Sequence, residues 1–415
     1  MLDTRVLYGA AGAAGPVDQA TVRRSNLSLV LRHLRDAGPR SRARIAQETG
    51  LNKATVSSLV AELIARGLAS EGPVDRAGAV GRPGTLVQLD GRGVCGIGVE
   101  LNVDYAAVLV LDLGGAVLFE HREGFDVPAR GVECTLDEVA ALVLQAGAAA
   151  ARRGAVPVGV TVAAPGLVES AVGTVTLAPN IGWRDVAVRA GLIARLPDLG
   201  CPVRVENDSN LSAIAEWAMG GEAREADLVF LTGEVGVGAG IIVGGRLLRG
   251  ASGFSGEVGH MPLGDPQRTC GCGRRGCWET VVGLAALLDH AADEDDPVRD
   301  PALDLEDRLA ELVRRAVAGD RRTLAALDRV VAQLAVGTAV LVNLFNPRAV
   351  VLGGYFAVLG GLLTGPLTGP LRDRVFAPDT AGARVVLSTL GFTAAVRGGA
   401  HVALESVFDD PTLVG

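Results

Sequence analysis

The chain has 415 residues, of which 49% are apolar and only 4% are aromatic, and its formal net charge is −8. This length exceeds one simple domain and suits two or three, and the scarcity of aromatic side chains predicts an aliphatic core, as in α/β proteins with buried strands. No apolar run of about 18 residues lacks a polar interruption, and Asp3 interrupts a weakly apolar N-terminus. We therefore expect no membrane span, no secretory signal and a cytoplasmic location.

The first part of the chain, after a segment 1–20 expected to be flexible, is basic although the whole chain is acidic. Residues 21–90 hold eleven Lys or Arg against six Asp or Glu, a balance of +5 that leaves −13 on the remainder. Apolar residues at helical spacing predict three helices here. They are 26–37, a short helix from a Ser41 cap to Gly50, and 53–65 with Asn52 as its cap.

A helix, a tight turn and a second helix are the parts of a helix-turn-helix, and two predicted strands, 68–70 and 85–89, add a wing. The loop between the strands carries Gly81-Arg82-Pro83, and an arginine at a loop tip suits a narrow minor groove. The alternative is a small helical docking domain without nucleic acid. The predicted contacts to double-stranded DNA are Ser41, Arg42, Asn52, Lys53, Thr55, Ser57, Ser58 and Arg82.

From residue 94 onward, apolar strands and helices alternate in an order that occurs twice. The first set contains strands 94–99, 105–111, 116–121, 157–163 and 202–205, with helices 135–153, which a Thr135–Glu138 capping box begins, and 185–196. The second contains strands 228–231, 239–243, 246–248, 349–352 and 385–387, with helix 327–344 and a closing helix 392–408. We therefore predict two α/β lobes, 91–208 (with 392–408 packing back on it) and 209–391, with a ligand cleft between them. The acidic stretch 289–300 is expected to be a solvated excursion.

Three of the six cysteines lie within eight residues, downstream of a histidine. Cys270, Cys272, Cys277 and His260 supply four thiolate or imidazole ligands, which suit tetrahedral Zn²⁺ in a closed structural site. Glycines 271, 273 and 276 allow the tight folding that brings the sulfurs together. The alternative is a set of reduced thiols beside a surface histidine. The remaining cysteines, Cys95, Cys134 and Cys201, are expected to be packing residues.

Polar residues that suit a ligand follow several of the predicted strands. Glu206, Asn207 and Asp208 come where a strand ends and a helix begins, and together they offer the donors and acceptors that vicinal hydroxyls need. Asp208 has the alternative role of a helix cap. Gly166 and Asn180 also lie in loops after strands. The glycine-rich residues 232–240 either cradle a phosphate or form a hairpin.

The assembled chain resembles the ROK family, which joins sugar-responsive repressors and sugar kinases on an actin-like (ribonuclease H-like) two-lobed fold. The resemblance covers nearly the whole chain, and its N-terminal domain looks like that of the xylose-repressor-type branch. It implies sugar contacts from Asn207, Asp208, Glu257, His260 and Glu279, and zinc bound by His260 with the three clustered cysteines. The segments that carry it are SRARIAQETGLNKATVSSLVAELIARGL, GRP, VENDSNLSAIAEW, GASGFSGEVGHM and CGCGRRGCWE.

The chain departs from the family's kinases where they bind nucleotide. Those kinases share an Asp-x-Gly-Gly-Thr turn after the first strand, whereas this chain has Glu100-Leu101-Asn102-Val103-Asp104. Side chains at 102 and 103 would fill the space of a phosphate, and Glu234 in the second phosphate turn would repel an anion. Asp208 matches the kinases' general base, but the same carboxylate binds the hydroxyl in a protein that only senses sugar.

We therefore predict a non-enzymatic, sugar-responsive transcriptional regulator, most simply a repressor, with a winged helix-turn-helix and a monosaccharide in the cleft. As a homodimer or homotetramer it would read a pseudo-palindromic operator. Two alternatives remain from the sequence: an ATP-dependent sugar kinase with an attached DNA-binding domain, and a regulator that senses zinc itself.

Overall fold

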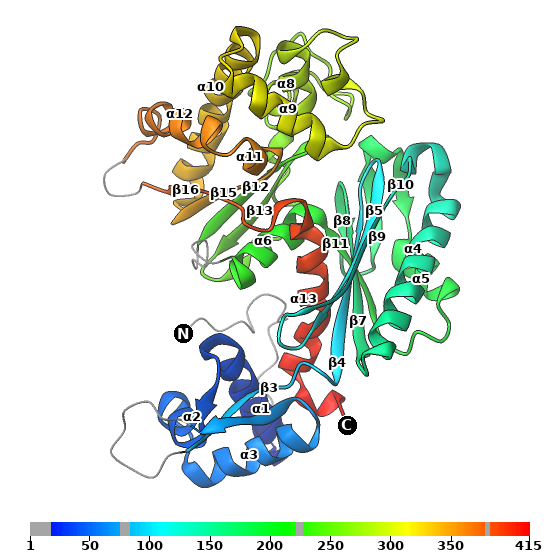
Figure 1. Cartoon of the computed structure of the whole chain (residues 1–415), viewed down its shortest axis with the longest axis vertical. Coiled ribbons are helices and arrows are strands. Elements are labelled where there is room, and N and C mark those ends of the chain that lie inside the picture. The colour runs from blue at the N-terminus through cyan, green and yellow to red at the C-terminus, as the bar shows by residue number, and fades with distance from the viewer. Residues whose placement is uncertain (1–17, 75–83, 221–226, 378–381) are drawn as a thin grey trace.

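The computed structural model describes residues 18–74, 84–220, 227–377 and 382–415, and Figure 1 shows their arrangement. A small N-terminal domain lies at one end of the molecule, and two α/β lobes lie side by side at the other. The C-terminal helix α13 (Ala394–Asp409) runs between them.

The N-terminal domain is a winged helix-turn-helix. Its elements are α1 (Gln19–Ala37), β1 (Arg40–Ser41), α2 (Arg42–Thr49), α3 (Lys53–Ala65), β2 (Ala69–Val74) and β3 (Thr85–Leu89), with strand order β1-β3-β2. Helix α3 has the predicted bounds, and the amide of Thr55 donates to Asn52 Oδ1 at 2.8 Å. Helix α1 begins seven residues before the predicted start, because Asp18 caps it by accepting from the amide of Thr21 at 2.6 Å.

The first lobe is built on a five-stranded sheet in the order β11-β7-β4-β5-β6. Its strands are β4 (Val94–Leu101), β5 (Tyr105–Asp112), β6 (Val117–Gly124), β7 (Val156–Ala164) and β11 (Val203–Asn207). Helices α4 (Val127–Arg152) and α5 (Val188–Arg195) cover one face of the sheet and α13 covers the other. A small sheet of β8 (Leu167–Glu169), β9 (Thr174–Ala178) and β10 (Trp183–Val186), with η2 (Pro179–Ile181), was not predicted.

Two predictions for the first lobe are wrong. Helix α4 begins at Val127 with Asp126 as its cap and bends at Gly131, whose φ is 73°. Thr135 therefore lies inside the helix, where its hydroxyl donates to the carbonyl of Gly131 at 2.8 Å, and it forms no capping box. Cys134 on the same helix is exposed, so it is not a packing residue, whereas Cys95 is buried.

The second lobe repeats the topology of the first. Its sheet has the order β14-β13-β12-β15-β16, with a three-stranded antiparallel meander followed by two parallel strands, as in the first lobe. The strands are β12 (Leu228–Gly233), β13 (Val237–Val243), β14 (Arg246–Leu247), β15 (Ala349–Gly354) and β16 (Arg384–Leu387). The helices are α6 (Asp208–Met219), η3 (Val258–His260), α7 (Glu279–Val282), α8 (Leu284–Ala291), η4 (Pro297–Arg299), α9 (Leu305–Val317), α10 (Arg321–Phe345), α11 (Tyr355–Leu359) and α12 (Gly361–Arg372), with η5 (Gly391–Thr393) and η6 (Pro411–Leu413) flanking α13. The predicted duplication of fold is confirmed.

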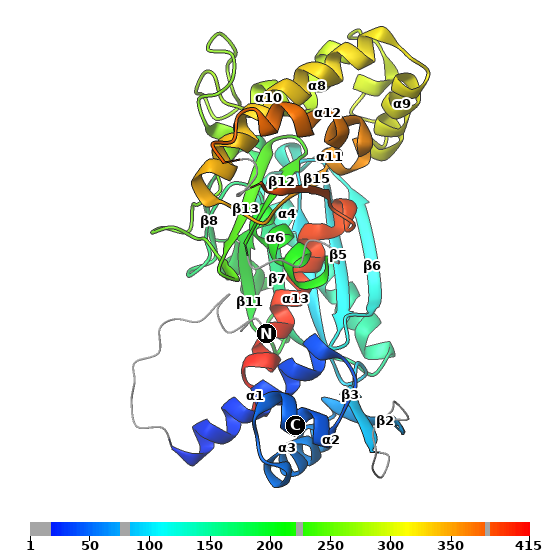
Figure 2. The same cartoon turned by 90° about the vertical axis from the view of Figure 1, so that its left-hand side faces the viewer.

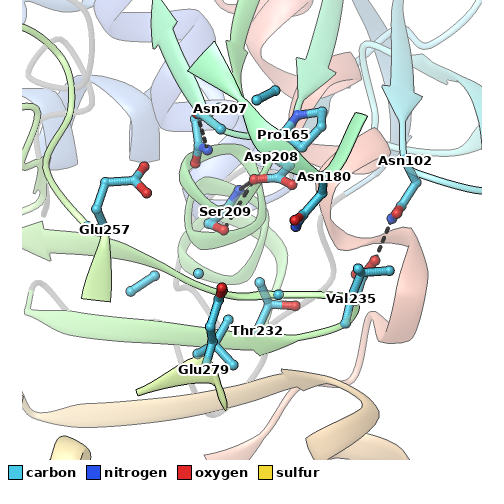
Figure 3. A pocket seen from close by; sticks show the side chains of 18 of the residues that line it. Asn102, Pro165, Asn180, Asn207, Asp208, Ser209, Thr232, Val235, Glu257 and Glu279 are labelled. Carbon is cyan, nitrogen blue, oxygen red and sulfur yellow. Dashed lines mark hydrogen bonds between the residues drawn. The ribbon is translucent and has the colours of Figure 1, made fainter. Parts of the chain in front are cut away.

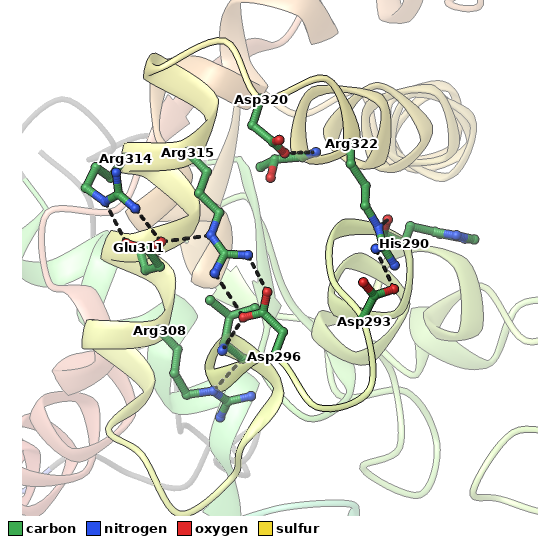
Figure 4. Close-up of polar contacts among 11 residues, drawn as sticks. His290, Asp293, Asp296, Arg308, Glu311, Arg314, Arg315, Asp320 and Arg322 are labelled. Carbon is green, nitrogen blue, oxygen red and sulfur yellow. Dashed lines mark hydrogen bonds and ion pairs between the residues drawn. The ribbon is translucent and has the colours of Figure 1, made fainter.

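The acidic stretch 289–300, which was predicted to be a solvated excursion, is held against the protein by ion pairs. Asp296 accepts two hydrogen bonds from Arg315 of α9, at 2.7 and 2.9 Å, and Arg315 also donates to Glu311 (Figure 4). Val298 in the same stretch is buried. Ion pairs therefore hold this segment against α9 through Asp296 and against α10 through Asp293, which pairs with Arg322.

Among the described residues, α4 and α10 are long and apolar enough to cross a membrane by length and composition alone. However, 50% and 61% of their most apolar windows are buried inside the protein. A buried core helix passes the same test, so these two helices are weak evidence for a span. The absence of a membrane span stays a prediction.

Candidate functional site

A cleft between the two lobes collects most of the predicted ligand residues. Asn207 ends β11 and Asp208 begins α6, while Asn180, Glu257 and Glu279 approach from three other segments (Figure 3). Gly166 and His260 line the same cleft. All seven predicted sugar residues therefore lie together, although they come from positions spread over more than a hundred residues.

The helix cap at α6 is Asn207 rather than Asp208. Asn207 Oδ1 accepts from the amide of Asn210 at 3.0 Å, and its Nδ2 donates to the carbonyl of Gly166 at 3.1 Å. Asp208 Oδ1 accepts from the amide of Ser209 at 2.6 Å. Burial raises the pKa of Asp208 to about 6, although the hydrogen bonds from Ser209 oppose this shift. The cap-only alternative for Asp208 is thus excluded, and its carboxyl group lines the cleft.

His260 lies between the cleft and the cysteine cluster. Its Nδ1 is 3.7 Å from Cys270 Sγ and 3.8 Å from Glu279 Oε1, whereas its Nε2 lies 3.9 Å from Glu257 Oε2. The two ring nitrogens therefore face different partners. Burial raises the pKa of Glu257 to about 7, and the nearby Asp208 and Glu279 add to the shift.

The predicted metal ligands converge. One ligand atom from each of His260, Cys270, Cys272 and Cys277 lies within 4.8 Å of all the others, and the Sγ atoms of Cys272 and Cys277 are 3.7 Å apart. A tetrahedral ion with metal–sulfur bonds of about 2.3 Å places its sulfurs about 3.8 Å apart, so the cluster fits such an ion. The folding back depends on the predicted glycines, of which 273 and 276 have φ of 85° and 74°.

The opposite half of the cleft carries a second group of acids. The hydroxyl of Tyr105 donates to Glu100 Oε1 at 2.7 Å, and Asn102 Nδ2 donates both to the Tyr105 hydroxyl and, across the lobes, to Glu234. Burial raises the pKa of Glu100 and of Glu234, and Asp208 raises both further. The described residues that line the cleft include five Asp or Glu and no Lys or Arg. Residues 232–240 form the hairpin of β12 and β13, so their hairpin reading is confirmed.

Most of the predicted DNA-contacting residues lie at the start of α3, and Ser41 and Arg42 lie at the start of α2. Asn52, Lys53, Ser57 and Ser58 are exposed, and Ser41, Arg42 and Thr55 are partly exposed. Ser41 precedes α2 as predicted but makes no side-chain cap, and Ser58 Oγ accepts from Arg23 of α1 at 3.3 Å. Arg82 lies outside the described residues. The placement of these residues does not test whether they contact DNA.

Sequence reasoning missed two polar residues that donate hydrogen bonds to acids of the cleft. Tyr105 bridges Glu100 and Asn102, and Ser209 holds Asp208. Ser209 belongs to the VENDSN segment, so that motif could have identified it. The bridge from Asn102 to Glu234 joins residues 132 positions apart, so no local pattern signals it.

The fold and the cleft define a two-lobed sugar-kinase-type domain joined to a winged helix. The ROK family model matches residues 96–406, three quarters of the sequence, and the chain therefore belongs to the ROK family. The MarR family model matches residues 28–78, which cover most of the winged helix-turn-helix. The resemblance seen in the sequence and its implied fold are confirmed.

Full-length relatives include named repressors. The chain is 30% identical to a putative xylose repressor of Caldicellulosiruptor sp. (strain Rt8B.4), over 96% of this chain and 100% of that one. It is 33% identical to a glucokinase of Streptomyces coelicolor, but that match covers only 61% of this chain. The crystal structure of a ROK family transcriptional regulator, a homologue of the E. coli MLC protein, matches 94% of the chain at 26% identity with a TM-score of 0.73. A ROK family glucokinase from Streptomyces griseus, in complex with glucose and AMPPNP, matches 75% at 29% identity with a TM-score of 0.64.

Proposed function

We propose that this protein is a sugar-responsive transcriptional repressor that binds a monosaccharide in the cleft and operator DNA through its winged helix. The observation that carries the proposal is the division of the cleft. One half carries side chains that suit sugar hydroxyls, and the other half is lined by Glu100 and Glu234 and offers, among the described residues, no Lys or Arg for a phosphate. The relatives that span the winged helix as well as the lobes are named repressors or regulators.

In this proposal Asp208 and Asn207 bind adjacent sugar hydroxyls as acceptor and donor, and Glu257 and Glu279 accept from others. Gly166 and Asn180 close the side of the site formed by the first lobe. His260 presents Nε2 to the sugar, while Nδ1 faces the cysteine cluster. No residue in this set transfers a phosphoryl group, and Asp208 acts as a hydrogen-bond acceptor rather than a base.

The cysteine cluster is proposed to bind structural Zn²⁺ through His260, Cys270, Cys272 and Cys277. Three soft sulfurs and one imidazole, close enough for one tetrahedral ion, suit zinc, and they leave no ligand position for water. The ion would fix the ring of His260 and the start of α7, where Glu279 stands. The chain's own cysteines and histidine would thereby hold two sugar-binding residues in place.

The remaining parts of the proposal concern DNA, assembly and location. Lys53, Ser57 and the other residues at the start of α3 would enter the major groove, and Arg82 in the wing loop the minor groove. A homodimer or homotetramer of cytoplasmic protein would read two half-sites. The proposed division is a DNA-binding domain 21–90, and lobes 91–208, with 392–408, and 209–391. Helix α1 begins at Gln19, so the bound between 20 and 21 is two residues late, and residues 1–17 lie outside the described residues.

The kinase alternative rests on the glucokinases that match the lobes. It requires nucleotide beside Glu100, where the phosphate-binding glycines are replaced by Asn102 and Val103. Release of ADP in the presence of sugar panels tests it, and turnover well above background would overturn the proposal of a non-enzymatic regulator.

A thermal-shift panel followed by operator titration tests the proposed function. D-xylose, D-glucose, D-mannose and D-glucose 6-phosphate are each added to the full-length protein, because a ligand of the folded state raises the melting temperature. The sugar that does so is then added to the protein bound to a duplex selected from a random-sequence pool. We expect an unphosphorylated sugar to bind and to weaken the DNA complex. A protein that binds the duplex but responds to no sugar contradicts the proposal.

A further inference from the structure

Helix α13 joins the cleft to the DNA-binding domain. Figures 1 and 2 show it running from between the lobes to the winged helix-turn-helix. Ala395 in its first turn lines the cleft, and Phe408 near its other end packs with α1. Its 16 residues span about 24 Å. One continuous element therefore contacts both the cleft and the DNA-binding domain.

The N-terminal half of α13 contacts its neighbours through backbone atoms. A Cβ placed on Gly98 of β4 would lie 1.9 Å from the carbonyl oxygen of Val396, and one on Gly398 would lie 2.0 Å from that of Leu211 in α6. Because α6 begins at Asp208 and β4 reaches Glu100, both neighbours lead directly to the cleft. No side chain stands between these backbones to absorb a shift by changing rotamer. A movement of α6 must therefore move α13.

The C-terminal half of α13 is joined to α1 by buried ion pairs. Glu405, which is 3% exposed, accepts from Arg32 Nη1 at 2.9 Å and from Arg35 Nη1 at 2.6 Å. Arg32 Nη2 also donates to Asp409 at 2.6 Å, and the guanidinium of Arg35 stacks on the ring of Phe408 at 4.6 Å. Burial opposes ionisation of Glu405, but the positive charges of Arg35 and Arg32 lower its pKa.

We propose that α13 carries the sugar signal to the DNA-binding domain, and that the Arg32–Arg35–Glu405 cluster is the junction where α1 follows it. This inference rests on the proposed function, since it presumes a sugar in the cleft and DNA on α3. Apolar contacts alone allow one helix to slide on another, whereas a buried ion pair holds a single register. A displacement of α13 thereby becomes a displacement of α1 and of the helix-turn-helix attached to it.

Two variants and a matched control separate coupling from stability. Arg35→Met removes one guanidinium but leaves Glu405 paired with Arg32, and Glu405→Gln removes the shared acceptor charge. Arg24→Met is the control, because Arg24 lies on the same helix and pairs with Asp410 just beyond α13, but it is about half exposed and 3.5 Å from its partner. Melting temperatures of all three variants show which of them are folded. If the Glu405→Gln protein is not folded, the Arg35→Met protein alone tests the inference.

The measured quantity is the Kd for operator DNA with sugar divided by the Kd without sugar, in the full-length protein. The sugar is the one that the thermal-shift panel selects, and D-xylose is tried first. In the wild type this ratio is expected to be roughly 5 to 150. We expect it to fall below about threefold in Arg35→Met and Glu405→Gln, with sugar affinity retained, and to stay unchanged in Arg24→Met. A variant that only loosens the domain lowers operator affinity equally in both states and leaves the ratio intact.

The outcomes distinguish the inference from the proposed function. A wild-type protein that binds operator but shows no ratio above one contradicts the proposed function, and the inference with it. A wild-type ratio that persists in folded Arg35→Met contradicts the inference alone. Loss of the ratio together with loss of sugar binding also contradicts it, because the cluster would then shape the cleft rather than transmit from it.

Discussion

The two halves of the cleft have similar charge but different partners. On the sugar side, Asp208, Glu257 and Glu279 face the cavity with capacity to accept hydrogen bonds. On the nucleotide side, Glu100 Oε1 accepts from Tyr105, and Glu234 accepts from Asn102 of the other lobe. The proposed sugar side thus presents acids to the cavity, whereas the other side contains a hydrogen bond that connects the two lobes.

Removal of the metal should reduce sugar binding more than any other change. Cys272→Ser is expected to lose the ion, about one zinc per chain in the wild type, and to abolish sugar binding, because His260 and Glu279 lose their support. Metal content by mass spectrometry and sugar binding by thermal shift check this. Cys134→Ser is the control, since that cysteine is exposed on α4. A Cys272→Ser protein that still binds sugar normally would show that the cluster is not a support for the site.

Asp208→Ala should weaken sugar binding strongly and leave operator binding intact. A hydrogen bond to a charged group contributes about 1.5–3 kcal/mol, so affinity is expected to fall roughly 10- to 150-fold. Calorimetric titration of sugar and fluorescence anisotropy with operator DNA measure the two effects. Asp208→Ala protein that released the operator at wild-type sugar concentrations would place the sugar elsewhere.

The charge-matched change on the other side of the cleft should have little effect. Glu234→Gln removes one acid, as Asp208→Asn does, but Glu234 contacts Asn102 rather than the proposed sugar position. We expect sugar affinity to change by less than about threefold, within the range of a single weak contact. A loss as large as that of Asp208→Asn would erase the distinction between the two halves.

Acid should weaken sugar binding modestly. The pKa of Asp208 is raised to about 6, so the carboxylate that accepts from the sugar is ionised at pH 7.5 and mostly protonated at pH 5.5. If only the ionised form binds, affinity falls about fourfold at pH 5.5. Asp208→Asn should lose this part of the pH dependence, and an identical profile in both proteins would assign the titration to another group.

Local patterns predicted the parts of the molecule that are determined locally. The bounds of α3, with its Asn52 cap, depend on short-range capping and periodicity, and the cysteine cluster depends on ligands and glycines within one stretch. The small sheet β8–β10 and the bend of α4 at Gly131 had no comparable signal. The Asn102–Glu234 bridge and the Arg32–Glu405 pair join residues far apart in the chain, and only the folded arrangement brings them together.

Titration of Mg²⁺–ATP into the sugar-saturated protein, with ADP release followed in the same sample, tests the division of the cleft most directly. The account predicts no binding heat at about 1 mM nucleotide and no ADP above background, because buried carboxyl groups and the side chains of Asn102 and Val103 fill the phosphate position. Saturable ATP binding with sugar-dependent ADP release would contradict it.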